Sequence, residues 1–227
     1  MAIELITKKQ NLDLKAPTTA DIKAAYNSGK AEGFNDGFVD GYAKGSGDGW
    51  SDGMIAAERA LWDTLQNKGA RKNYRYAFYN HFWINDIFNP AYPITCSEVS
   101  SEAFRYSGIT DTKVDIIFTH TSSNYVFANC ASLKTIKSLS VTEGVTFVGW
   151  FAGCSALENI TISGVIGQNI DFSPCTLLSY ASLKSIKDHL KDYGGGTAYT
   201  LTVGSANAAK YTDADKAEIS KKGWVLK

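Results

Sequence analysis

The sequence predicts an α/β fold: a short solenoid of stacked coils with a narrow parallel sheet, preceded by a long N-terminal helix with a Gly-x-x-x repeat. Three observations lead to this prediction. An eleven-residue segment recurs 24 residues further along the chain, β-branched runs lie between the copies, and glycine occupies every fourth position near the N-terminus. Self-similarity with a period of roughly 20 to 50 residues is typical of repeat architectures.

The clearest copies are residues 126–136 and 150–160, which align without a gap. They share phenylalanine, cysteine, leucine and isoleucine at Phe127, Cys130, Leu133 and Ile136 in the first copy and at Phe151, Cys154, Leu157 and Ile160 in the second. Degraded copies surround Phe104 and Phe172. We expect each copy to form one coil, so that stacking places phenylalanine on phenylalanine and cysteine on cysteine in a continuous core.

Short runs between the copies and after them predict the regular elements. Residues 113–118, 138–141 and 159–163 are rich in β-branched or alternating apolar residues and predict strands of a narrow parallel sheet. Further on, the pattern predicts a helix over 182–190, a break at 194–196, a strand over 199–203, a helix over 212–219 capped by Thr212, and a closing strand over 224–226. We expect the last of these elements to cap the stack.

The four cysteines form no Cys-x-x-Cys pair, which argues against a zinc or redox site. Because three of them recur at one repeat position, we expect small, buried, free thiols. A disulfide between the stacked residues Cys130 and Cys154 is the alternative.

The signature aromatic-x-x-Cys-x-x-Leu-x-x-Ile, at 127–136 and 151–160, resembles the BspA-type leucine-rich repeats over roughly residues 96–190. The chain is also similar to proteins encoded in phages and prophages of gut bacteria. Those proteins join a glycine-rich N-terminal segment to such repeats and end in a Lys-Gly-Trp motif, here Lys222-Gly223-Trp224. The resemblance implies binding and adhesion, not catalysis, and supplies no binding residues that can be transferred.

The glycine ladder consists of seven glycines spaced four residues apart, at Gly29, Gly33, Gly37, Gly41, Gly45, Gly49 and Gly53. This spacing aligns them on one helical ridge, but each interior glycine costs about 1 kcal/mol relative to alanine. Close contact with another helix would offset that cost. We therefore predict a helix over 19–66 whose ladder, with the aromatic residues Phe34, Phe38, Tyr42 and Trp50, is an oligomerisation or attachment face. A calcium-binding loop array and a flexible linker are the alternatives.

These patterns divide the chain into five parts: an N-terminal arm (1–18), the Gly-x-x-x helix (19–68), an aromatic junction and N-terminal cap (69–95), the leucine-rich repeats (96–190) and a C-terminal cap (191–227). The aromatic junction has two interpretations. Its rings cap the first coil, or they form a sugar-stacking platform from Tyr74, Tyr76, Tyr79 and Trp83.

Composition and motifs exclude several function classes. Lys plus Arg equals Asp plus Glu, at 23 each, so we expect no nucleic-acid binding. There is neither a long apolar run nor a basic start followed by an apolar stretch, so we expect no membrane insertion and no signal peptide. We find no metal-ligand spacing, phosphate-binding loop or nucleophile elbow, and expect no enzyme activity, no cofactor and no metal site. A carboxylate pair from Asp111 and Asp115, as in a glycosidase, is the catalytic alternative.

The favoured function is that of a phage virion structural or adhesion protein, fibre-like at the tail or head, made in the host cytoplasm and carried on the virion. Expected partners are a second copy of the chain, other virion proteins, and a host-surface protein or glycan. The alternative is a bacterial leucine-rich-repeat adhesin or interaction module.

Overall fold

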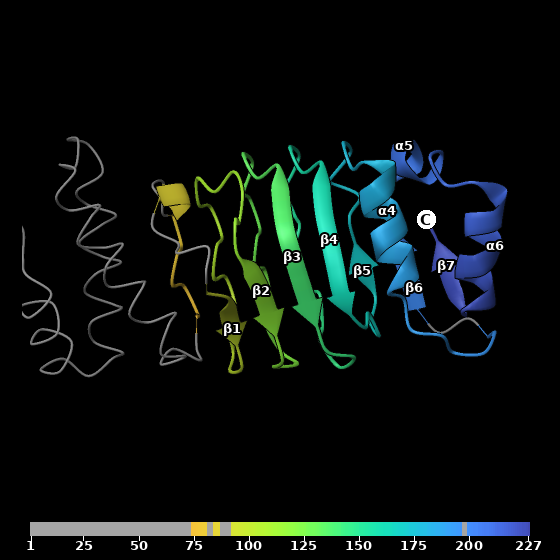
Figure 1. The fold of residues 1–227 in the computed structure, drawn as a ribbon, viewed down its shortest axis with the longest axis horizontal. Helices are drawn as coiled ribbons and strands as arrows, with labels where there is room; N and C mark the ends of the chain where they lie inside the picture. Colours follow the sequence, from red (N-terminus) through yellow and green to blue (C-terminus); the bar gives the residue numbers. More distant parts are fainter. Residues whose placement is uncertain (1–73, 81–83, 87–91, 197–198) are drawn as a thin grey trace, which may run out of the picture.

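A computed structural model of the chain describes residues 74–80, 84–86, 92–196 and 199–227. They form a mixed α/β structure with two narrow parallel sheets, which confirms the predicted α/β class and the parallel arrangement. Figure 1 shows successive strands lying side by side, with the C-terminal helices at the far end of the stack. The predicted helix over 19–66 and its glycine ladder lie outside the described residues.

The first sheet contains four parallel strands in chain order, β1 (Ile94–Cys96), β2 (Asp115–Phe118), β3 (Thr135–Val141) and β4 (Asn159–Gly164). Buried apolar side chains form a column across it, because the register pairs Ile116 with Leu139 and Leu139 with Ile162. The predicted strands at 113–118, 138–141 and 159–163 are confirmed with shifted ends. β3 begins three residues earlier than expected, at Thr135, and β1 was not predicted.

The second sheet contains β5 (Ile170–Asp171), β6 (Tyr199–Thr202) and β7 (Trp224–Leu226), all parallel. Helices α5 (Ser205–Ala208) and α6 (Asp213–Lys221) accompany it, whereas α4 (Tyr180–Asp188) packs against β4 of the first sheet. A 3-10 turn, η1 (Ile84–Asp86), precedes β1. Thr212 caps α6 as predicted: its side chain accepts a hydrogen bond from the Asp215 N–H, and the Asp215 carboxylate accepts one from the Thr212 N–H.

Helix α4 ends the first sheet where a fifth strand would otherwise lie. The hydroxyl of Ser182 accepts a hydrogen bond from the Ile160 N–H, and that of Ser185 accepts one from the Ile162 N–H, each at 2.9 Å. The Ser182 hydroxyl also donates to the Glu158 carbonyl at 3.1 Å. These hydroxyls satisfy the outer edge of β4, which would otherwise offer unpaired backbone groups to another strand.

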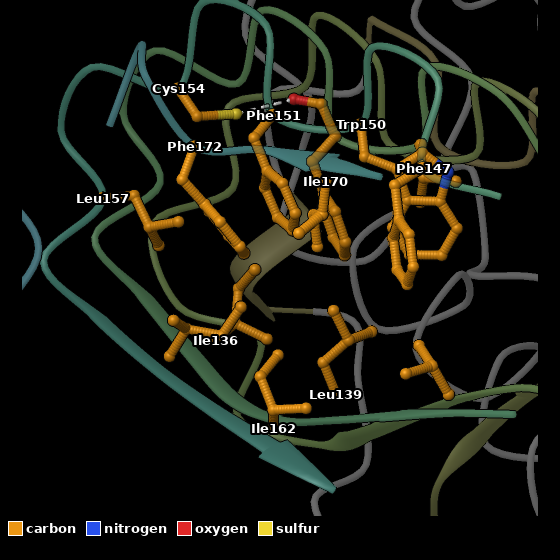
Figure 2. Close-up of a cluster of buried hydrophobic side chains, with 14 of the residues drawn as sticks. Ile136, Leu139, Phe147, Trp150, Phe151, Cys154, Leu157, Ile162, Ile170 and Phe172 are labelled. Carbon is orange, nitrogen blue, oxygen red and sulfur yellow. Dashed lines mark hydrogen bonds between the residues drawn. The ribbon is translucent and has the colours of Figure 1, made fainter. Parts of the chain in front are cut away.

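Five phenylalanine rings stack in one column through the core. Ring centroids lie 4.9 Å apart from Phe78 to Phe104, 5.0 Å from Phe104 to Phe127, 5.9 Å from Phe127 to Phe151 and 4.5 Å from Phe151 to Phe172, with interplanar angles of 9–22°. Figure 2 shows the rings of Phe151 and Phe172 facing the strand residues Ile136, Leu139 and Ile162 across the core. The predicted stacking of phenylalanine on phenylalanine is confirmed, and Phe78 extends the column by one ring.

The repeated cysteines are buried free thiols, as predicted, and the disulfide alternative is wrong. Each thiol lies against the backbone carbonyl of the column phenylalanine in the previous coil, not of the phenylalanine in its own coil. Cys130 Sγ donates to Phe104 O at 2.9 Å and Cys154 Sγ to Phe127 O at 3.0 Å, while Cys175 Sγ lies 4.0 Å from Phe151 O. Cysteine is thus a small apolar residue here that also satisfies a buried carbonyl.

These thiols are expected to resist alkylation in the folded protein. Burial raises the pKa of Cys130 to about 11 and that of Cys175 to about 12, and it also raises the pKa of Cys154. The reactive thiolate is therefore scarce at pH 8. Mass spectrometry after iodoacetamide treatment should find these three cysteines unmodified in buffer and modified in guanidinium chloride. Equal labelling under the two conditions would contradict this structure of the core.

Candidate functional site: the tyrosine ridge

Opposite the first sheet, the chain makes four similar seven-residue segments, which we call the aromatic turns. They are residues 74–80, 100–106, 123–129 and 147–153, and each has its column phenylalanine at the fifth position. In the first three turns, the N–H groups of the third, fifth and seventh residues donate to carbonyls of the next turn, at 2.6–3.2 Å. This second hydrogen-bond ladder holds the turns in a regular stack.

The third and seventh residues of each turn have a left-handed backbone. In the first three turns these residues are not glycine, with φ between 55° and 60°, at Tyr76, Asn80, Glu102, Tyr106, Tyr125 and Asn129. The fourth turn has glycine at both positions, Gly149 and Gly153. A left-handed conformation costs a non-glycine residue roughly 1 kcal/mol. Because glycine fits this turn, the side chains of the other three turns must offset that cost by packing or by function.

Four tyrosines from the first three turns form a continuous surface file, which we call the tyrosine ridge. It contains Tyr76, Tyr79, Tyr106 and Tyr125. The ring of Tyr79 lies edge-to-face between two others, 5.8 Å from Tyr76 and 5.6 Å from Tyr106. Tyr76, Tyr106 and Tyr125 are 37–40% exposed. Tyr79 is half-buried and links two of these exposed rings, and together the rings form a surface suited to an apolar or amphipathic ligand.

Arg105 joins Tyr106 to Tyr125 within the ridge. Its guanidinium carbon lies 4.9 Å from the centre of the Tyr106 ring and 5.4 Å from that of the Tyr125 ring. The guanidinium donates to the Glu102 carboxylate at 2.6 Å and to the Tyr106 hydroxyl at 3.3 Å. The hydrogen bond to Glu102 is the main reason that the pKa of Arg105 is raised. The middle of the ridge is therefore rigid and locally neutral.

The glycines of the fourth turn leave space for the side chains at the end of the ridge. A Cβ atom at Gly149 would clash with the ring of Tyr125, and one at Gly153 would clash with the side chain of Asn129. Side chains of the third turn therefore pack directly against the backbone of the fourth turn. Tyr125 is the last ring of the file.

The predicted platform of Tyr74, Tyr76, Tyr79 and Trp83 is partly corrected. Tyr76 and Tyr79 belong to the ridge, whereas Trp83 lies outside the described residues. The prediction for Tyr74 is wrong: its side chain is 2% exposed and its ring stacks 6.2 Å from Phe78, so it extends the core. Tyr106 and Tyr125 were missed, although aligning the copies on phenylalanine places Tyr125 level with Tyr76.

Among the described residues, no cluster of three or more His, Cys, Asp or Glu side chains could hold a metal ion. No helix in this part of the chain is both long and apolar enough to cross a bilayer. Comparisons of the chain with protein-family models, curated proteins and solved structures find no match.

Proposed function

We propose that the chain is a binding protein built on a short leucine-rich-repeat solenoid and serves as a structural or adhesion protein of a phage virion. The observation that carries the proposal is the exposed tyrosine ridge on a hydrogen-bonded frame. Support for the solenoid comes from the phenylalanine column, and from a strand of the first parallel sheet that follows each of the four aromatic turns.

The frame suits a binding surface because it holds the rings in place before a ligand arrives. Tyrosine offers a large amphipathic area with few rotatable bonds, so little conformational entropy is lost on binding. The second hydrogen-bond ladder fixes the backbone beneath each ring. A left-handed backbone is strained for tyrosine, and it occurs at Tyr76, Tyr106 and Tyr125. Contact of these side chains with a ligand would explain why tyrosine is present there.

In this proposal, the glycine ladder at 29–53 provides attachment to the virion and oligomerisation, while the ridge faces a host-surface protein or glycan. Its support is the four-residue spacing of the glycines and the sequence features that resemble phage-encoded repeat proteins, which are the glycine-rich N-terminal segment, the repeat signature and the Lys222-Gly223-Trp224 motif. The proposed activity is binding, without catalysis, a cofactor or a membrane-spanning segment.

The full chain is therefore expected to be a homo-oligomer. Replacing Gly37 and Gly41 by leucine would block close approach of two helices and should convert the oligomer to a monomer. Light scattering after size exclusion measures the mass, and thermal unfolding checks that the repeats remain folded. A wild-type chain that is already a monomer would remove the oligomerisation part of the proposal.

The adhesion part is tested by sedimenting the full chain with bacterial cell envelopes. We expect the wild-type chain to co-sediment with envelopes of a susceptible host among a panel of gut bacteria. Failure to bind every envelope in the panel would reject adhesion as the function of this chain.

A further inference from the structure

We infer that the tyrosine ridge binds an uncharged polysaccharide chain that lies along the direction in which the aromatic turns are stacked. This inference rests on the proposed binding function and adds the chemical class and the orientation of the ligand.

The shape of the ridge favours a linear ligand. Its rings form a single file across three turns, with neighbouring centroids 5.8 Å apart from Tyr76 to Tyr79 and 5.6 Å apart from Tyr79 to Tyr106. The file ends at Tyr125, beyond which the fourth turn has only Gly149, Ala152 and Gly153 at the equivalent ridge positions. A single file of four rings carried by three successive turns matches an extended chain better than it matches a single compact molecule.

The width of the ridge argues against a protein as the ligand. A stable protein interface buries roughly 800 Å² on each partner and has a broad, apolar, well-packed centre. Here the exposed tyrosines form a narrow file, which the exposed Val148 of the fourth turn extends by one small side chain, and the remaining exposed large apolar side chains, Leu177 among them, belong to other segments of the chain. A polysaccharide needs only a narrow track of this kind.

Two arginines lie over ridge rings, Arg75 at 5.1 Å from the centre of the Tyr76 ring and Arg105 in the middle of the ridge. The charges in the middle of the ridge favour an uncharged ligand. Arg105 is paired with Glu102 at 2.6 Å, and its guanidinium also lies over two tyrosine rings. An anionic chain would have to compete with Glu102 for this cation. A neutral chain binds without disturbing the pair.

The polar groups at the ridge complete the match to a sugar. A pyranose ring has apolar C–H faces and a rim of hydroxyls, which suit an aromatic ring and a hydrogen-bonding side chain respectively. Asn80 and Asn129 occupy the seventh position of their turns, as Tyr106 does in the second turn. Their amide groups are therefore in positions equivalent to that of a ridge ring. The tyrosine hydroxyls add further donors and acceptors.

Affinity electrophoresis of the full chain tests the inference, using gels that contain a soluble β-glucan, a mannan or, as the anionic comparison, an alginate. We expect at least one of the two neutral polysaccharides to retard the chain, and alginate to retard it less. Tyr106→Ala should weaken binding about tenfold, because loss of one stacking ring corresponds to roughly 1.4 kcal/mol. Tyr106→Phe keeps the ring and should retain most of the affinity.

The matched control is Tyr180→Ala, since Tyr180 is 45% exposed but lies on α4, away from the aromatic turns. It should bind like the wild-type chain, and thermal unfolding confirms that each variant is folded. Retardation by alginate alone, no retardation by either neutral chain, or unchanged binding by both Tyr106→Ala and Tyr125→Ala would overturn the inference.

Binding to bacterial cell envelopes distinguishes a failure of this inference from a failure of the proposed adhesion function. Binding that survives periodate oxidation of the envelopes but is lost after protease treatment would overturn the polysaccharide and leave adhesion in place. Binding lost on periodate oxidation supports the inference.

Discussion

Replacing Phe127 by alanine is expected to lower the free energy of unfolding by about 3–5 kcal/mol. Its side chain is fully buried, and its ring stacks on Phe104 at 5.0 Å and on Phe151 at 5.9 Å. The substitution removes the middle ring of the column and leaves a cavity that neighbours on both sides cannot fill. Guanidinium chloride unfolding followed by circular dichroism measures the loss.

Leu177→Ala is the control for this prediction, because Leu177 is 53% exposed and its truncation should change stability by no more than about 0.5 kcal/mol. A double variant that also truncates Phe151 tests the column itself. Contacting residues share their partners, so the two losses should not add. A loss below about 1 kcal/mol for Phe127→Ala would mean that the column is not the main support of the core.

The stack was predictable from the sequence because phenylalanine recurs at near-constant spacing. Stacked coils bury equivalent residues against one another, so the rings are expected to stack. Phe78 escaped the prediction because it lies 26 residues before Phe104, a longer spacing than the 21–24 residues that separate the other rings of the column. The place where the first sheet ends also escaped. Ser182 and Ser185 follow a helical pattern in sequence, and only their contacts with β4 reveal that they replace a strand.

The tyrosine ridge was only half predictable, for a physical reason. The repeat period shows which residues are equivalent, but not in which direction their side chains leave the backbone. The left-handed conformation of Tyr106 and Tyr125 sets that direction, and single-residue propensities do not predict such a conformation for tyrosine. Tyr74 looks equivalent to Tyr76 by composition, yet its position in the turn directs it into the core.

A buried lysine links the two long C-terminal helices. Lys187 of α4 is 5% exposed and forms ion pairs with Asp188 at 3.3 Å, with Asp215 of α6 at 3.1 Å, and with Glu218 of α6. Burial alone would lower the pKa of Lys187, but its hydrogen bonds to the three carboxylates outweigh that effect and raise it. The lysine is therefore charged at neutral pH and holds α6 against α4.

Lys187→Ala is expected to lower the free energy of unfolding at pH 7 by about 3–5 kcal/mol, because it leaves the nearly buried Asp215 without its cation. Chemical unfolding at pH 7 measures the change. The control is Lys184→Ala, on the same helix: Lys184 pairs with Asp188 at 2.6 Å, but its side chain is 55% exposed. An exposed pair contributes at most about 1 kcal/mol, so the control should lose much less stability than Lys187→Ala.

The same variant has a characteristic pH dependence. The Thr212 hydroxyl is the main cause that holds the pKa of Asp215 well below its usual value, and Lys187 and Tyr180 lower it further. A depressed carboxyl pKa adds stability above the unfolded-state value of about 3.9, and that stability is lost as pH falls toward the folded-state pKa. Lys187 also lowers the pKa of Glu218. The deficit of Lys187→Ala relative to the wild-type chain should therefore be largest near pH 7 and shrink below about pH 4. A deficit that stays constant from pH 7 to pH 2 would show that Lys187 stabilises the helix pair by packing alone, without its charge.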